Sequence, residues 1–231
     1  MSKNRERLKK TLSPKLAAAY KARLSRAANK LDSRELANIL STCAGSELLV
    51  DNSGALGIVV VAGSVDCARV LLPYSSARSC GASLPVAAGS GFSDCLREIL
   101  SHPEFSGAPC RLRDVSTAAS AAVRGEKPLC LELLAISVES PEDRHALFDP
   151  LLIAMLNGSW ASFDVVSRFC GREVLGDAVE MLAKHRDKGF SSERLSTMIA
   201  AGRSQLARDQ ERAAIEECSQ AAKSAPRILR I

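Results

Sequence analysis

Apolar side chains recur at helical spacing in the first part of the chain. From residue 14 to 31 they follow one another at intervals of three or four, at Leu16, Tyr20, Leu24, Ala27 and Leu31. This spacing places them on one face of a helix, and lysines and arginines occupy its other faces. Ser13 and Pro14 suit the N-cap and the first residue of this helix. A second helix is predicted to begin at the capping-box segment 32–35 and to end near Gly45.

The same spacing returns near the C-terminus. Residues 173–188 form one predicted helix. A serine at position 191 or 192 then caps a longer helix that continues to about Cys218. Gly202 is a weak point within it, and Pro226 is its stop. We expect this segment to cap the end of the fold, and its part beyond Gly202 is a candidate docking or dimerisation helix.

The middle of the chain contains a decayed internal repeat. Four segments align on Gly63, Gly91, Gly125 and Gly158, which are 28, 34 and 33 residues apart. A Leu or Ala stands seven residues before each glycine, a Val or Ala stands four before it, and mostly apolar pairs follow eight and nine after it. Each unit therefore predicts a short helix of small residues, a turn that needs glycine for a left-handed backbone, and a second helix with an apolar stripe.

These units resemble the ankyrin repeat, whose unit contains Thr-Pro-Leu-His, Ala-Ala, Gly and a Leu-Leu pair at a period near 33 residues. The copies around Gly91 and Gly158 match it best. No copy has the intact Thr-Pro-Leu-His. The position of the family's His is held by Gly57, Pro85, Ala119 and Leu152. The resemblance therefore implies a less regular stack, or another helical-hairpin solenoid.

We accordingly expect an all-α fold, a helical-hairpin solenoid. It would be an ankyrin-like array of about four to five repeats with helical N- and C-terminal extensions. Residues 1–50 are expected to form basic N-terminal helices or a cap, and residues 51–170 to form the array. Residues 171–231 are expected to form a C-terminal helical cap or extension.

Charge is distributed unevenly along the 231 residues. Residues 1–35 have 11 basic and 3 acidic side chains, residues 36–170 have 9 and 14, and residues 171–231 have 11 and 9. The basic segment 3–30 is either a solvated or disordered lead-in, a docking site for an acidic partner or anionic membrane surface, or a nucleic-acid contact. Its one aromatic residue, Tyr20, lies on the apolar stripe, so bases have no platform for stacking.

The cysteines and the start of the chain fit a cytoplasmic protein. No apolar run approaches the roughly 18 to 20 residues that cross a bilayer, and the first thirty residues have no apolar signal-peptide region. No two of the eight cysteines are closer than 13 residues, which excludes Cys-x-x-Cys metal and redox motifs. We expect reduced thiols that are mostly buried. Exposure is left open for Cys80 and Cys110, which fall in predicted loops.

Few residues suggest catalytic chemistry. His102, His145 and His185 lie after or between helices in polar surroundings, and no His-x-x-x-His pair exists. The glycines of residues 89–91 lack the third glycine and the lysine of a phosphate-binding loop. We therefore predict no enzymatic activity, no cofactor and no metal site.

The resemblance to ankyrin arrays implies protein binding through a concave surface and its loops, here predicted over 73–81, 101–114 and 135–148. Candidate partner-binding residues are Arg78, Phe105, Arg111, Arg113, Arg124, Arg144 and Trp160. A core position for Trp160 beneath the C-terminal helices is an equal alternative. The chain is expected to be an adaptor or an occluding inhibitor, and its Ala- and Ser-rich composition suits a bacterial effector delivered into a host cell. The alternative is a nucleic-acid-associated regulatory protein that uses the basic arm.

Overall fold

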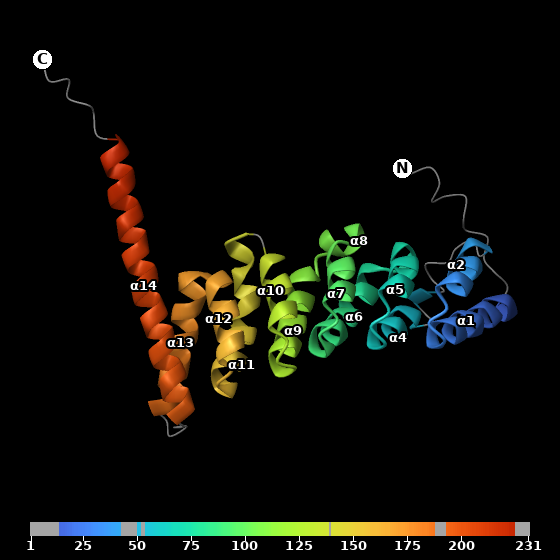
Figure 1. The fold of residues 1–231 in the computed structure, drawn as a ribbon, viewed down its shortest axis with the longest axis horizontal. Coiled ribbons are helices and arrows are strands. Elements are labelled where there is room, and N and C mark those ends of the chain that lie inside the picture. The colour runs from blue at the N-terminus through green and yellow to red at the C-terminus, as the bar shows by residue number, and fades with distance from the viewer. Residues whose placement is uncertain (1–13, 43–49, 52–53, 139, 188–192, 225–231) are drawn as a thin grey trace, which may run out of the picture.

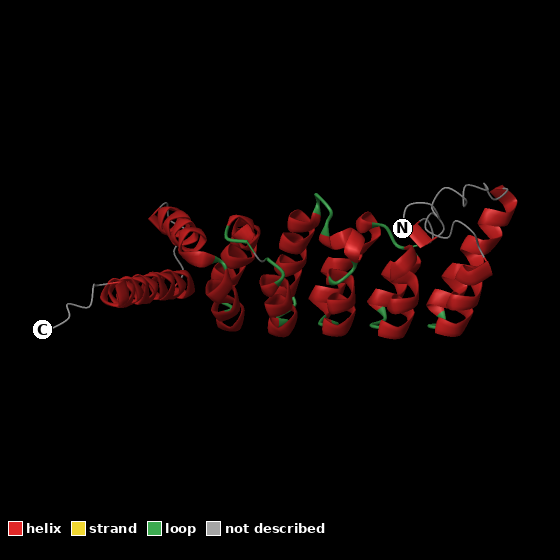
Figure 2. Cartoon of the chain, turned by 90° about the horizontal axis from the view of Figure 1, so that it is seen from above, coloured by secondary structure: helices red, strands yellow, loops and turns green. Residues whose placement is uncertain are grey.

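In the computed structural model every described element is a helix. The structure describes residues 14–42, 50–51, 54–138, 140–187 and 193–224, and no strand occurs among them. The helices stand side by side in one elongated row, with α1 at one end and α14 at the other (Figure 1), and the row is equally plain from above (Figure 2). The prediction of an all-α fold is confirmed. Residues 3–13, serines 191 and 192, and Pro226 lie outside the described residues.

The helices follow one another in pairs, each with a first and a second helix. The pairs are α1 (Pro14–Asn29) with α2 (Ser33–Thr42), α4 (Ala55–Val61) with α5 (Val65–Leu71), α6 (Ala77–Ser90) with α7 (Ser93–Leu100), α9 (Arg111–Arg124) with α10 (Pro128–Ile136), α11 (Phe148–Asn157) with α12 (Trp160–Phe169), and α13 (Gly171–Asp187) with α14 (Glu193–Ser224). Three short elements lie between pairs: η2 (Leu72–Tyr74), α8 (Pro103–Ser106) and η3 (Glu142–Leu147).

The pairs pack in two layers. In one layer the first helices contact their neighbours in the order α1, α4, α6, α9, α11, α13. In the other the second helices do so in the order α2, α5, α7, α10, α12. The buried apolar side chains lie between and within these layers and form one continuous core along the row.

From α1 to α12, the first helix of every pair ends in the same hydrogen-bonded turn. A residue with a left-handed backbone follows the helix: Leu31, Gly63, Gly91, Glu126 or Gly158, with φ of 55°, 69°, 86°, 54° and 64°. The next amide donates to the carbonyl oxygen five residues before it at 2.9 to 3.0 Å: Asp32 to Ala27, Ser64 to Val59, Phe92 to Ala87, Lys127 to Ala122, and Ser159 to Ala154. This is the Schellman closure of a helix C-terminus.

The turn of the third predicted unit differs from the sequence prediction by one residue. Gly125 has an ordinary helical φ of −82°, and Glu126 takes the left-handed conformation. Gly125 is required for another reason: a Cβ there would lie 2.3 Å from the carbonyl oxygen of Gly89 on α6. When the units are aligned on Glu126, Cys130 takes the same place as Cys67 and Cys95, four residues after the left-handed residue.

The same positions are buried in each of these five pairs. Seven, four and three residues before the left-handed residue the core contains Leu24, Ala27 and Ala28; Leu56, Val59 and Val60; Leu84, Ala87 and Ala88; Ala119, Ala122 and Val123; and Leu151, Ala154 and Met155. Five and eight residues after it lie Leu36 and Ile39; Ala68 and Leu71; Leu96 and Ile99; Leu131 and Leu134; and Phe163 and Val166. The pair α1 and α2, predicted as a cap, therefore has the same build as the four middle pairs.

The predicted loops are partly helical. The segment 73–81 includes the start of α6, because Ser76 caps that helix by accepting a hydrogen bond from the amide of Ser79 at 3.3 Å. Segment 101–114 includes α8 and the start of α9, and segment 135–148 includes the end of α10 and η3. Helical residues thus make up most of the segments that the sequence predicts as loops.

The last pair closes the row with longer helices. Gly202, predicted as a weak point, is buried within the uninterrupted helix α14, and a Cβ there would lie 2.4 Å from Cγ2 of Val179 on α13. Gly202 therefore allows the two helices to approach closely. Further along α14, residues 211–220 are all exposed, and this part extends beyond the body of the molecule (Figure 1). None of the described helices combines the length and apolar character needed to span a bilayer.

Candidate functional site

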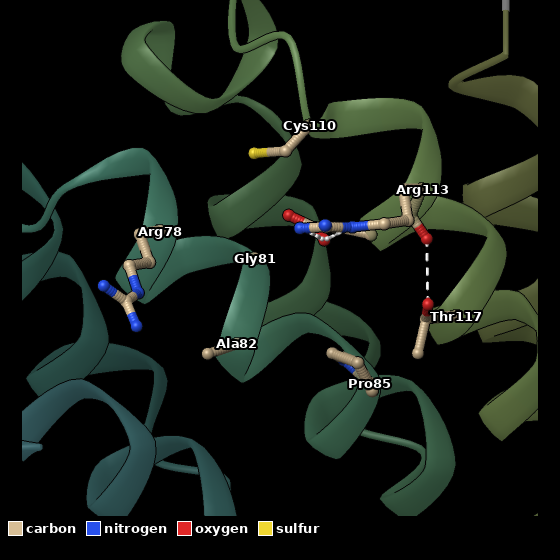
Figure 3. Close-up of a pocket in the computed structure, with 8 residues that line it drawn as sticks. Arg78, Gly81, Ala82, Pro85, Cys110, Arg113 and Thr117 are labelled. Carbon is tan, nitrogen blue, oxygen red and sulfur yellow. Dashed lines mark hydrogen bonds and ion pairs between the residues drawn. The ribbon is translucent and has the colours of Figure 1, made fainter.

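Two grooves open along the first helices and the turns that follow them. The α6/α9 groove has a volume of about 340 Å³ and is lined by Arg78, Gly81, Ala82, Pro85, Cys110, Arg113, Asp114 and Thr117 (Figure 3). The Trp160 groove has about 550 Å³ and is lined by Val123, Arg124, Glu126, Asn157, Gly158, Ser159, Trp160, Glu193, Arg194, Thr197 and Met198. Both are open clefts on the surface, of the kind that receives a side chain or a short segment of another molecule.

The grooves bring together four of the seven predicted contact residues. Arg78 and Arg113 line the α6/α9 groove, and Arg124 and Trp160 line the Trp160 groove. All four side chains are exposed. These four residues are therefore placed where a partner can reach them.

Phe105 was predicted to contact a partner, and the structure places it in the core. It lies on the one-turn helix α8, has no exposed surface, and belongs to the continuous apolar core. Helix α8 packs against α6 and α7. Pro103 starts this turn at its first helical position, and the apolar ring then turns inward. The prediction for Phe105 was wrong because the segment is helical and buried on one side.

Arg111 and Arg144 connect neighbouring pairs and line neither groove. Arg111 is half-buried, and its guanidinium donates to the backbone oxygen of Ser137 at the end of α10. Arg144, also half-buried, lies against the junction of α12 and α13, where a Cβ on Gly171 would be 3.1 Å from Nη1 of Arg144. We assign both side chains to packing between pairs.

In the α6/α9 groove the two arginines stand on opposite sides of a floor of small residues (Figure 3). Arg78 projects from α6 on one side, and Arg113 projects from α9 on the other. Arg113 donates from Nε and Nη2 to Oδ1 of Asp114, both at 3.3 Å. The carboxylate of Asp114 lies against Gly81 in this floor. A Cβ on Gly81 would lie 2.1 Å from its Oδ2, so the position requires glycine.

The Trp160 groove has an aromatic wall and two arginines. Trp160 is 52% exposed, and its ring meets Phe163 edge to face at 6.2 Å between centroids. The aliphatic part of Arg194 lies over the turn at Gly158, where a Cβ would be 3.4 Å from Cδ of Arg194. Trp160 is thus held by the core at its edge while its remaining surface stays open, as in typical protein-binding hot spots.

Several lining residues were missed by sequence reasoning. Glu193, Arg194 and Thr197 reach the Trp160 groove because α14 folds back against α11 and α13. No local pattern in the sequence signals that return. Pro85 and Thr117, in the α6/α9 groove, could have been found from their place on the first helices, whose exposed faces follow from helical spacing.

The described arginines differ in their ion pairing. On the second helices Arg69 pairs with Glu98 at 2.8 Å, Arg97 with Asp94 at 3.4 Å, and Arg168 with Asp164 at 3.5 Å. Within the described part of the chain, Arg78, Arg124 and Arg194 have no ion pair. Arg113 is paired with Asp114, so three of the four arginines that line the grooves have no ion pair in this part of the chain.

The thiols of Cys80, Cys110 and Cys170 have a raised pKa. Burial raises the pKa of Cys80 and that of Cys170 to about 12. A hydrogen bond to Asp114, followed by burial, raises the pKa of the Cys110 thiol. A thiol with a raised pKa is a poor nucleophile, because the thiolate is the reactive species. Cys80, for which exposure was left open, is buried in α6, 3.9 Å from Nδ1 of His102.

In the ranges that the structure describes, no three His, Cys, Asp or Glu side chains are grouped so as to hold a metal ion. His145 and His185 are exposed, on η3 and α13. The grooves present arginine, aromatic and small apolar side chains, together with the carboxylates of Asp114 in one groove and of Glu126 and Glu193 in the other.

Comparisons of the chain with protein-family models, curated proteins and solved structures gave no match.

Proposed function

We propose that the chain is a non-enzymatic protein-interaction module, an adaptor or an occluding inhibitor. It would bind a partner through the first helices and the turns that follow them. The observation that carries this proposal is the Trp160 groove, where the half-exposed Trp160 stands beside two arginines without ion pairs. Trp and Arg are the side chains most enriched where binding energy concentrates in protein interfaces.

We further propose that the helix pairs are diverged ankyrin-like repeats. Five pairs share one closing turn and one set of buried positions, which supports a common repeating unit. Their first helices use Ala and Gly where neighbours approach, as at Gly89 and Gly125. The family's His is absent, and close backbone packing between first helices takes the place of its hydrogen bonds.

The proposed mechanism is recognition by a preformed surface. The grooves are lined by side chains on helices that pack into one core, so little conformational entropy is lost when a partner binds. Trp160 would enter an apolar contact, and Arg124 and Arg194 would pair with acidic or carbonyl groups around it. Side chains along the first helices would then set specificity.

The test compares Trp160→Ala with a matched exposed residue on a second helix. Leu129 is 58% exposed on α10 and lines neither groove, so Leu129→Ala serves as the control. Full-length wild type and both variants are immobilised, and the proteins that they capture are quantified by mass spectrometry. The proposal expects proteins retained by wild type and Leu129→Ala that Trp160→Ala loses about tenfold or more. If every captured protein binds all three equally, the proposal is wrong.

A second candidate function is supported by helix α1. Its Lys15, Lys21 and Arg26 are exposed, and α1 contains no acidic side chain. This favours a polyanion contact of a nucleic-acid-associated regulatory protein. Binding of single-stranded DNA would then weaken steeply with salt and would be lost when all three are changed to Glu.

A further inference from the structure

We infer that the α6/α9 groove binds an extended acidic segment of the partner, with carboxylates held by Arg78 and Arg113. This inference rests on the proposed function, because it names the chemistry of a partner that the module would bind. It concerns the smaller groove, away from Trp160. Its argument begins with the positions of the two arginines.

Arg78 and Arg113 occupy the same place in neighbouring repeats. Each stands 13 residues before the left-handed residue that closes its first helix, Gly91 or Glu126. Because α6 and α9 pack directly against each other, the two arginines stand at equivalent positions of adjacent helices, one on each side of the groove (Figure 3). Packed helices lie about 8 to 10 Å apart.

This separation matches the spacing of side chains on an extended chain. An extended backbone advances about 3.3 Å per residue, so residues two to three apart span roughly the distance between adjacent helices. Arginine and glutamate side chains are long enough to absorb the remaining difference. Two acidic residues separated by one or two others would therefore reach both guanidinium groups together.

The floor of the groove leaves room for a backbone. Between the two arginines lie Gly81, Ala82 and Pro85, and Thr117 closes the far side (Figure 3). None of these side chains is large. The volume of about 340 Å³ can receive side chains of an extended peptide that lies across α6 and α9. No aromatic residue lines the groove, which argues against nucleic acid as the occupant.

The carboxylate of Asp114 is compatible with this occupant. Its Oδ2 is directed at Gly81, and the Cys110 thiol is also its hydrogen-bond partner. The side chain of Asp114 is 15% exposed, whereas that of Arg113 is 79% exposed. Ion pairs between such exposed groups and their neighbours are weak, so Arg113 can also bind a carboxylate from outside. The weak pair with Asp114 thus leaves Arg113 available at the groove, and Arg78 has no competing ion pair among the described residues.

The test measures binding of a short fluorescein-labelled peptide with glutamate at alternate positions, by polarisation at low salt. The variant is Arg78→Glu/Arg113→Glu in the full chain. The control is Arg34→Glu/Arg172→Glu, which changes two exposed arginines outside both grooves and alters the net charge equally. We expect the groove variant to bind at least about tenfold more weakly than wild type, and the control to bind within about threefold. Arg78→Lys/Arg113→Lys should retain most of the affinity.

Equal binding by the two double-reversal variants would overturn the inference, because it would show that only net charge matters. The same peptide with glutamine in place of glutamate should not bind. A single-stranded oligonucleotide that depends on Arg78 and Arg113 while the acidic peptide does not would also overturn it. Since Trp160 is untouched, loss of this inference leaves the capture experiment with Trp160→Ala as an independent test of the proposed function.

Discussion

At the scale of single residues, the left-handed backbone that the sequence predicts at Gly125 lies one residue later, at Glu126. The glycine of this turn is needed for close approach to the carbonyl oxygen of Gly89, and the left-handed backbone falls on a glutamate. A side chain in that conformation is strained by about 1 kcal/mol relative to glycine. Close packing between α6 and α9 therefore explains the glycine at position 125 better than the backbone conformation of the turn does.

Substitutions at these two positions should have opposite effects on stability. Gly125→Ala should lower the free energy of unfolding by about 1 to 3 kcal/mol, because the new methyl group meets backbone. Glu126→Gly should raise it by up to about 1 kcal/mol by relieving strain. Urea unfolding followed by circular dichroism measures both. Gly57→Ala is the control, since nothing lies within 4 Å of a Cβ there, and it should be neutral or stabilising. A stable Gly125→Ala variant would contradict this account.

The buried thiols predict how stability depends on pH. The pKa of Cys80 and that of Cys170 are raised to about 12, whereas an unfolded thiol titrates near pH 8.5. Above about pH 8.5 the unfolded chain loses these protons first, so stability is complete below that pH and falls as pH rises toward 12. Each thiol contributes a slope of at most about 1.4 kcal/mol per pH unit. Under reducing conditions, the urea midpoint should decrease less between pH 8 and pH 10 in Cys80→Ala/Cys170→Ala than in wild type. Equal falls would show that these thiols do not contribute.

At the scale of helices, the spacing of apolar residues predicts most of the helices, but it does not predict which distant helices pack against each other. The stripes at residues 14–31 and 173–188 correspond to α1 and α13, because an apolar face at helical spacing is a local property. The inward turn of Phe105 and the contribution of Arg194 to the Trp160 groove depend on contacts with distant helices. The one-residue shift at Gly125 escaped the alignment because a glycine required for close approach looks the same as one required for a turn.

Helix α14 should divide into a structural half and a projecting half. Its first part packs against α11 and α13, whereas residues 211–220 are exposed throughout. Removal of residues 211–231 should therefore leave the melting temperature within about 2 °C of wild type, a change below about 1 kcal/mol. Gly202→Val should lower it by several degrees, because its Cβ would meet Val179. A large loss of stability on truncation would show that the projecting part has a partner, such as a second copy of the chain.

At the scale of the whole molecule, the apolar core lies within the row and the two grooves open at its surface. Each helix pair packs mainly on its neighbours, so the core is continuous and the molecule is extended (Figure 1). Arg69, Arg97 and Arg168 on the second helices are ion-paired, whereas Arg78, Arg124 and Arg194 at the grooves have no ion pair among the described residues. Small residues of the first helices allow close stacking and leave the surface between them open. One side of the row is thereby proposed to be free for a partner.

The fluorescence of Trp160 tests the proposed binding side most directly, because it is the single Trp of the chain and lines the larger groove. Titration with a captured partner fragment that lacks tryptophan should shift its emission to shorter wavelength, since binding would remove water from a ring that is now 52% exposed. Arg124→Glu should weaken the affinity obtained from this shift by about tenfold. Partner binding detected by calorimetry without any change in Trp160 emission would contradict the account.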